Sequence, residues 1–128
     1  MKVLAFAASN SKHSINRTLA ASAAGIVGEA SVEVLDLNDY ELPIFSEDRE
    51  KALGQPEPAK RFLDKIGEAD CLIIAHAEHN GSFTAAYKNL LDWSSRIERK
   101  IFQDKPTLML ATSPGPGGGA NVLAWAQR

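Results

Sequence analysis

Four short strand-like runs alternate with segments of helical periodicity along the chain, and this order constrains the fold more than any other feature. The strand-like runs lie at 3–7, 32–37, 71–75 and 107–112, and the helical segments at 15–27, 58–67, 84–97 and 120–128. Short apolar runs suit strands buried on both faces of a parallel sheet. Their alternation with helices predicts a doubly wound α/β sheet in three α/β/α layers. We therefore expect a single domain over residues 1–128.

The helical segments carry apolar stripes that we expect to face the sheet. The stripes consist of Leu19, Ala23, Ile26 and Val27; of Ala59, Phe62, Leu63 and Ile66; and of Ala86, Leu90, Trp93 and Ile97. Residues 38–57 contain prolines, a glycine and a cluster of charges, so we expect irregular structure there with at most one exposed helical turn.

The loop that follows the first strand has the composition of an anion site. Residues 9–16 hold hydroxyl and amide side chains directly before a helix, and Lys12 adds one charge at the rim. Free backbone N–H groups and the helix dipole attract an anion at such a position. The alternative is that Ser14 or Asn16 merely caps the helix and nothing binds. The segment is neither a Walker loop nor a Rossmann glycine motif.

Two further loops follow strands of the expected sheet and therefore fall at the same edge. Ligands of such sheets bind at this edge, beyond the carboxyl ends of the strands. Asn80-Gly81 is a turn dipeptide, and the ring of His79 beside it suits stacking on a flat ligand. Residues 113–119 hold four glycines and two prolines, which let a flat ligand lie against backbone. Taken singly, each loop also fits a plain exposed connection.

Two motifs resemble those of the NAD(P)H-dependent FMN reductase family. Ser9-x-Ser11-x-x-Ser14-x-Asn16 is similar to its phosphate loop, Gly-Ser-x-Arg-x-x-Ser-x-Asn. Residues 78–93 resemble its longer signature, Pro-Glu-Tyr-Asn-Gly-Ser followed by Lys-Asn-x-x-Asp-Trp. The chain departs from the family at four of these positions, namely Ala8 for glycine, Ser11 for arginine, Ala77 for proline and His79 for tyrosine.

The resemblance implies a flavodoxin-like fold with strand order 2-1-3-4, and bound FMN. The residues that it places at the FMN phosphate are Ser9, Ser11, Lys12, Ser14, Ile15 and Asn16. Those that it places along the flavin ring, mainly through backbone, are Glu78, His79, Asn80 and Gly81, with Ser113, Pro114 and Gly115 on the other side. It further implies a homodimer or homotetramer.

The implied activity is an oxidoreductase that passes two electrons from NADPH or NADH through FMN to a small acceptor. Quinones, azo dyes, metal oxyanions and free flavin are candidate acceptors, and no side chain is assigned a catalytic role. Lys88 and Asp92 are expected to pair at i, i+4, and Trp93 to pack in the core. Two alternatives stay open: a flavodoxin-type electron carrier, and a non-catalytic domain.

The length of the sequence bears on the second alternative. A fifth strand and its helix, usual in this fold, are not found in the 128 residues, so we expect either a four-stranded domain or a C-terminally truncated one. The sheet would then expose its fourth strand.

Composition excludes several other classes of function. The formal net charge of −2 argues against nucleic acid and anionic membranes as partners. No apolar run approaches the roughly 20 residues of a membrane span, so we expect a cytoplasmic protein. The three histidines and the single cysteine show no metal-ligand spacing, so we expect no metal site.

Overall fold

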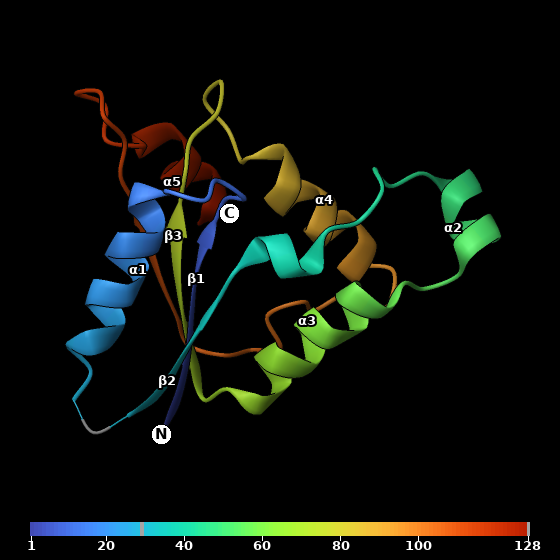
Figure 1. Ribbon diagram of the computed structural model, residues 1–128, viewed down its shortest axis with the longest axis horizontal. Helices are drawn as coiled ribbons and strands as arrows, with labels where there is room; N and C mark the ends of the chain where they lie inside the picture. The colour runs from blue at the N-terminus through green and yellow to red at the C-terminus, as the bar shows by residue number, and fades with distance from the viewer. Residues whose placement is uncertain (29, 128) are drawn as a thin grey trace.

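The structure, a computed structural model, describes residues 1–28 and 30–127; the predicted helix end at Arg128 lies outside the described residues. Strands and helices alternate as expected (Figure 1). The elements are β1 (Lys2–Ala8), α1 (Ile15–Gly25), β2 (Ser31–Leu35), the 3-10 helix η1 (Leu37–Tyr40), α2 (Glu47–Leu53), α3 (Glu57–Glu68), β3 (Cys71–His76), α4 (Ala85–Ser94), β4 (Thr107–Ala111) and α5 (Ala120–Ala126).

The four described strands form one parallel sheet in the order β2-β1-β3-β4, which confirms the predicted order. β1 lies between β2 and β3, with Leu4 opposite both Glu33 and Leu72. The register carries on to β4, where Leu72 lies opposite Thr107. Because all strands run the same way, their carboxyl ends meet at one edge, and the loops that follow them start there.

Each face of the sheet has its own apolar cluster, because successive side chains of a strand point to opposite faces. Phe6 and Ile74 pack with Phe62 of α3 and Leu90 of α4 on one face. The other face packs residues such as Ala5 and Ile73 against α1. Figure 1 shows α1 on one side of the strands and α3 with α4 on the other, which is the expected three-layer arrangement.

The predicted inward stripes hold for α3, largely for α4 and in part for α1. All four stripe residues of α3 are buried, as are Leu90 and Trp93 of α4. On the α1 side, Leu19, Ala23 and Val27 are partly buried against the apolar cluster as predicted, and Asn16, Ala20 and Ala24 are the buried residues of the helix. The expectation for Ile26 is wrong: the helix ends at Gly25, and Ile26 is 85% exposed. Small residues bring α1 close to the sheet, and their weak hydrophobicity gave no signal of their burial in the sequence.

Residues 41–46, here called the strap, lie against α4 in an extended, irregular path. The Asn89 side chain accepts from the Phe45 N–H at 2.9 Å and donates to the carbonyls of Leu42 and Pro43 at 3.2 and 3.1 Å. The indole N–H of Trp93 donates to the same Pro43 carbonyl at 2.7 Å, and the Phe45 ring meets the Trp93 ring edge-on at 5.1 Å. The stretch expected to be irregular is therefore held in place by α4.

The helix that follows the strap is the seven-residue α2, and with η1 the stretch holds more helix than the single exposed turn expected there. α2 carries acidic side chains in its first turn and Lys51 in its last, as the helix dipole favours. Of the helices within residues 1–28 and 30–127, none combines the length and the apolar character required to cross a bilayer.

Truncating Phe62 tests the packing of α3 on the sheet. Its ring is fully buried and meets Phe6 and Tyr40 edge-on at 5.6 and 5.9 Å. We expect Phe62→Ala to lower the free energy of unfolding by about 3–5 kcal/mol, measured by urea denaturation. The control Lys60→Ala changes an exposed residue of the same helix and should stay within about 0.5 kcal/mol. A loss below about 1 kcal/mol for Phe62→Ala would contradict this packing.

Candidate functional site

An open cleft of about 270 Å³ lies at the carboxyl edge of the sheet. Three loops form it: loop 1 (residues 9–14) after β1, loop 3 (77–84) after β3 and loop 4 (112–119) after β4. Its lining residues are Ser9, Ser11, His13, Ser14, Ile15, Asn16, Ala77, Glu78, His79, Thr112, Ser113 and Pro114. The parallel strands thus bring segments about 100 residues apart in the sequence to one place.

Most of the residues singled out from the sequence line this cleft. Those outside its lining are Lys12, Asn80, Gly81 and Gly115. His13, Ala77 and Thr112 line it without having been predicted. Each of the three directly neighbours a predicted residue in its loop, so adjacency in the sequence was the signal that could have found them. The assignment of the predicted residues to parts of a ligand stays a prediction.

The first turn of α1 offers hydrogen-bond donors to the cleft. Ser14 caps the helix, since its hydroxyl oxygen accepts from the Arg17 N–H at 3.4 Å. The N–H groups of Ile15 and Asn16 have no partner among residues 1–28 and 30–127, because the first N–H groups of a helix lack an acceptor within it. Capping uses an oxygen lone pair of Ser14 and leaves its hydroxyl hydrogen available. The helix cap and an anion site are therefore compatible here.

The two other serines of loop 1 add hydroxyl groups beside these donors. Ser9 is buried, and its hydroxyl oxygen accepts from the Ser11 N–H at 3.1 Å, which fixes the bend of the loop. Arg17 pairs with Asp36 at 3.5 Å and adds a cation behind the loop. The pKa of Asp36 is lowered, chiefly by the hydrogen bond that its carboxylate accepts from the Asn38 backbone.

Asn16 uses its side-chain amide within the protein. It donates to the Thr112 carbonyl at 3.1 Å and accepts from the Thr112 N–H at 3.0 Å. Its side chain is buried, at 2% exposure. The amide that the sequence suggested for a ligand thus joins the start of α1 to the end of β4.

Loop 3 begins with a tight hairpin. Asn80 and Gly81 both have positive φ, at 53° and 76°, as the two central residues of a type I′ turn require. His79 and Ser82 exchange two backbone hydrogen bonds of 3.0 and 3.1 Å across it. The predicted turn is confirmed. It projects above the sheet between β3 and α4 (Figure 1), with the exposed His79 at the cleft.

Two side chains anchor loop 3 on both sides. The Glu78 carboxylate accepts from the Val122 N–H in the first turn of α5 at 2.7 Å. Thr84 is buried, donates its hydroxyl to the Ala8 carbonyl at 2.8 Å, and accepts from the Tyr87 N–H at the start of α4. Loop 3 is therefore tied to α5 on one side and to β1 on the other.

Loop 4 returns to the sheet through Gly119, the N-cap of α5, which has a φ of 80°. A Cβ atom at this position would lie 2.9 Å from Cβ of Ala111 in β4. Only glycine allows both the left-handed backbone and this close approach. The glycine-rich composition thus has a structural reason at this position, separate from any ligand.

His76 ends β3 directly below loop 3 and is buried, at 1% exposure. Neither ring nitrogen has a hydrogen-bond partner among the described residues, and the ring lies 5.8 and 5.3 Å from the rings of Phe83 and Tyr87. Burial lowers the pKa of His76 to about 4 and raises the pKa of the Tyr87 phenol. His76 is therefore neutral in the native protein near pH 7.

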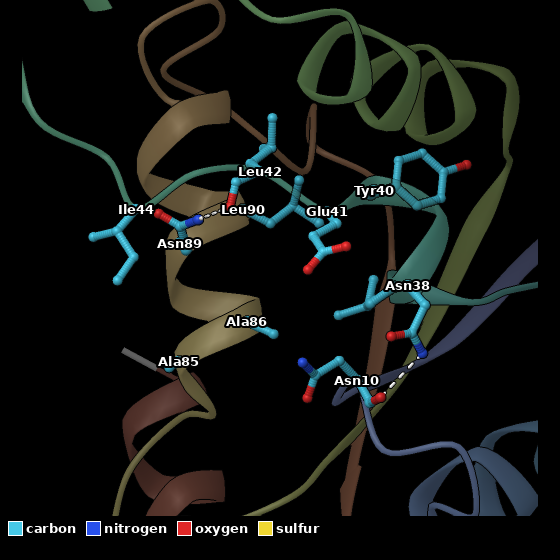
Figure 2. A pocket seen from close by; sticks show the side chains of 11 residues that line it. Asn10, Asn38, Tyr40, Glu41, Leu42, Ile44, Ala85, Ala86, Asn89 and Leu90 are labelled. Carbon is cyan, nitrogen blue, oxygen red and sulfur yellow. Dashed lines mark hydrogen bonds between the residues drawn. The ribbon is translucent and has the colours of Figure 1, made fainter. Parts of the chain in front are cut away.

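A second hollow of about 170 Å³ lies on the other side of loop 1, between η1, the strap and α4 (Figure 2). The Asn10 side chain and the Glu41 carboxylate point into it from opposite walls, and Ala86 forms a third wall. Asn89 and Trp93 hold the strap that forms one of its walls. Sequence reasoning assigned Trp93 to the core and gave Asn89 no role, because no local pattern indicates a hydrogen bond to residues more than 40 positions away.

The fold and the cleft define a flavodoxin-like α/β domain with an open cleft at the carboxyl edge of its sheet. The family model described as NADPH-dependent FMN reductase matches residues 1–126, and the chain belongs to this family. The NAD(P)H-dependent FMN reductase of Pseudomonas aeruginosa is 36% identical over 123 residues, which cover 95% of this chain and 65% of that protein. A probable NADPH:quinone oxidoreductase of Oryza sativa is 36% identical over 93% of this chain and 61% of that protein.

Solved structures agree with the fold. A flavoenzyme NAD(P)H:(acceptor) oxidoreductase from Paracoccus denitrificans superposes with a TM-score of 0.76 at 28% identity, over 98% of this chain and 68% of that one. An NADH:FMN oxidoreductase in its apo form has a TM-score of 0.72 at 21% identity, over 99% of this chain and 65% of that one. The chain spans less than two thirds of the length of the curated relatives described above.

Substituting Gly119 tests the close approach of loop 4 to β4. We expect Gly119→Ala to lower the free energy of unfolding by about 1–3 kcal/mol, because alanine at positive φ is strained and its Cβ meets Ala111. Gly115→Ala in the same loop is the control, since a Cβ there meets open space. Equal stability of the two variants would contradict the described path of the loop.

His76 predicts a pH dependence of stability. Its pKa is about 4 in the native state against 6.5 for the free side chain, so the unfolded state binds the proton first as pH falls. Stability is therefore fully present above about pH 6.5 and falls by about 3 kcal/mol toward pH 4. We expect His76→Leu to flatten this slope in denaturation series at several pH values. His13→Gln, at an exposed histidine, should keep the slope, and a wild-type slope in His76→Leu would assign it to other groups.

Proposed function

We propose that this chain binds FMN in the cleft and acts as an NAD(P)H-dependent oxidoreductase. One observation carries the proposal: N–H groups that have no partner in the described part of the chain, and hydroxyl groups beside them at the start of α1, share an open cleft with loops 3 and 4. Such a donor set suits a phosphate, because it supplies hydrogen bonds and the positive end of a helix dipole. The donors fit the phosphate group of FMN without a bound metal.

In this proposal each loop holds one part of the ligand. The hydroxyls of Ser9, Ser11 and Ser14 and the N–H groups of Ile15 and Asn16 bind the phosphate, with Lys12 at the rim. The flavin ring lies between loop 3, from Glu78 to Gly81, and loop 4, from Ser113 to Gly115. The rigid hairpin at Asn80 presents backbone and the His79 ring to one edge of the flavin. Stiff loops favour binding because less conformational entropy is lost when the ligand arrives.

When bound, FMN supplies two-electron redox chemistry, taking a hydride equivalent from NADPH or NADH and delivering electrons to an acceptor. The chain positions the ligand, and this chemistry requires no side-chain acid or base. The cleft is open on one side, which leaves room for a nicotinamide and then an acceptor to reach the same ligand in turn.

The relatives guide the choice of acceptor. Among them are proteins named as FMN reductases and as quinone oxidoreductases, so we propose quinones as the first acceptors to assay, with azo dyes, metal oxyanions and free flavin next. The cytoplasmic location and the homodimer or homotetramer expected from the sequence stay predictions.

A comparison of FMN with riboflavin tests the phosphate site. We expect the protein to bind FMN at least about tenfold more tightly than riboflavin, measured by quenching of flavin fluorescence. Ser11→Ala should weaken FMN binding about tenfold and leave riboflavin unchanged, since the Ser11 hydroxyl makes no hydrogen bond within the described chain. Ser22→Ala, on the exposed face of α1, is the matched control.

The same preparation separates the alternative functions. Anaerobic mixing of the FMN-loaded protein with NADPH or NADH should bleach the flavin absorption, and adding a quinone should restore it. Binding without bleaching would favour a flavodoxin-type electron carrier. Absence of FMN binding at micromolar concentrations would remove both redox functions.

A further inference from the structure

We propose that the side chains of Glu78 and Asn16 are positioning groups, which act on the ligand only by holding the backbone of neighbouring loops. This inference rests on the proposed FMN site and deepens it. Both residues line the cleft, yet the Asn16 amide is engaged by the backbone of Thr112 at the start of loop 4, and one Glu78 carboxylate oxygen by the backbone of α5. Their hydrogen bonds hold the three loops together before any ligand binds, and we call each such side-chain contact a latch.

The Glu78 latch joins loop 3 to the helix that follows loop 4. Its carboxylate accepts from the Val122 N–H at 2.7 Å, although 44 residues separate the two in sequence. Val122 is fully buried, so this N–H lacks access to water. A carboxylate at a helix start is favoured both by the hydrogen bond and by the dipole. The bond sets the distance between the two loops assigned to the flavin ring.

The Asn16 amide continues the hydrogen-bond pattern of the sheet beyond the end of β3. Backbone groups of alternate residues in a strand point to the same side. Thr112 is six residues from Pro106, whose carbonyl accepts from Leu72 of β3, so the Thr112 N–H and C=O also point toward β3. β3 ends at His76, and the Asn16 amide pairs with both groups in its place. The start of α1 is thereby fixed against the start of loop 4.

The Thr84 side chain provides a third connection between the loops. Thr84 at the end of loop 3 donates to the Ala8 carbonyl at 2.8 Å, next to loop 1. Loop 1 is thus tied to loop 4 by Asn16, loop 4 to loop 3 through α5 by Glu78, and loop 3 back to loop 1 by Thr84. Side-chain hydrogen bonds therefore connect each of the three loops to the other two, which preorganises the cleft for the ligand.

Charge and position predict opposite effects for the loss of Glu78. Glu78 lines the same cleft as the donors assigned to a phosphate. If the carboxylate acted only through its charge, its removal would relieve repulsion and tighten FMN binding. If it acts as a latch, its removal frees loop 4 and weakens binding. The sign of the change therefore distinguishes the two roles.

The test uses four variants of the full chain: Glu78→Ala, Glu78→Gln, Asn16→Ala, and Glu47→Ala as a control of equal charge change on the exposed α2. We expect Glu78→Ala and Asn16→Ala to bind FMN about tenfold more weakly. Glu78→Gln should stay within about threefold of the wild type, because a glutamine oxygen still accepts from Val122. Glu47→Ala should equal the wild type.

Amide hydrogen exchange without ligand tests the latches independently of FMN. Protection of the Val122 N–H should fall in Glu78→Ala and persist in Glu78→Gln, and protection of the Thr112 N–H should fall in Asn16→Ala. Tighter or unchanged FMN binding in Glu78→Ala, or a loss in Glu78→Gln equal to that in Glu78→Ala, would overturn the proposal. A wild type that shows these protections but binds no FMN would instead refute the proposed function and leave the latches standing.

Discussion

The parallel hydrogen-bond ladder from β2 through β1 and β3 to β4 is the constraint on which the rest of the structure depends. Parallel strands require long crossovers, so helices cover both faces and every strand ends at the same edge. That edge gathers loops 1, 3 and 4 from positions far apart in the sequence. Any shift in strand register would move Asn16 and Thr112 apart, and the hydrogen bonds that join loop 4 to the start of α1 would be lost.

The fold was readable from the sequence because its signals are local. β1, β3 and β4 are compact apolar runs, and α3 repeats large apolar residues at helical spacing, so the positions of these elements were predicted correctly, whereas the strand order came from the family resemblance. The face of α1 was predicted only in part: Leu19 and Ala23 pack against the core as expected, but the most buried contacts come from Ala20, Ala24 and the polar Asn16. Small side chains allow close packing but give little periodic signal, so Ile26, outside the helix, was assigned to the interior instead.

The site was only partly readable, for the same physical reason. Hydroxyl groups before a helix and an Asn-Gly turn are local features, and both lie at the cleft or next to it as expected. The contacts that join the loops are not local: Asn16 meets a residue 96 positions away. Sequence reasoning identified Asn16 and Glu78 as site residues, but their partners follow only from the three-dimensional arrangement of β4 and α5.

Trp93, which with Asn89 holds the strap, is a natural fluorescent probe of the strap's position. The emission of an indole depends on whether its N–H is hydrogen-bonded and on how much water surrounds the ring. Trp93 is buried, donates to the Pro43 carbonyl and meets the Phe45 ring, so detachment of the strap would change all three conditions together. Once Trp125, the other tryptophan of the chain, is changed to phenylalanine, tryptophan fluorescence therefore reports whether the strap is attached to α4, without an added label.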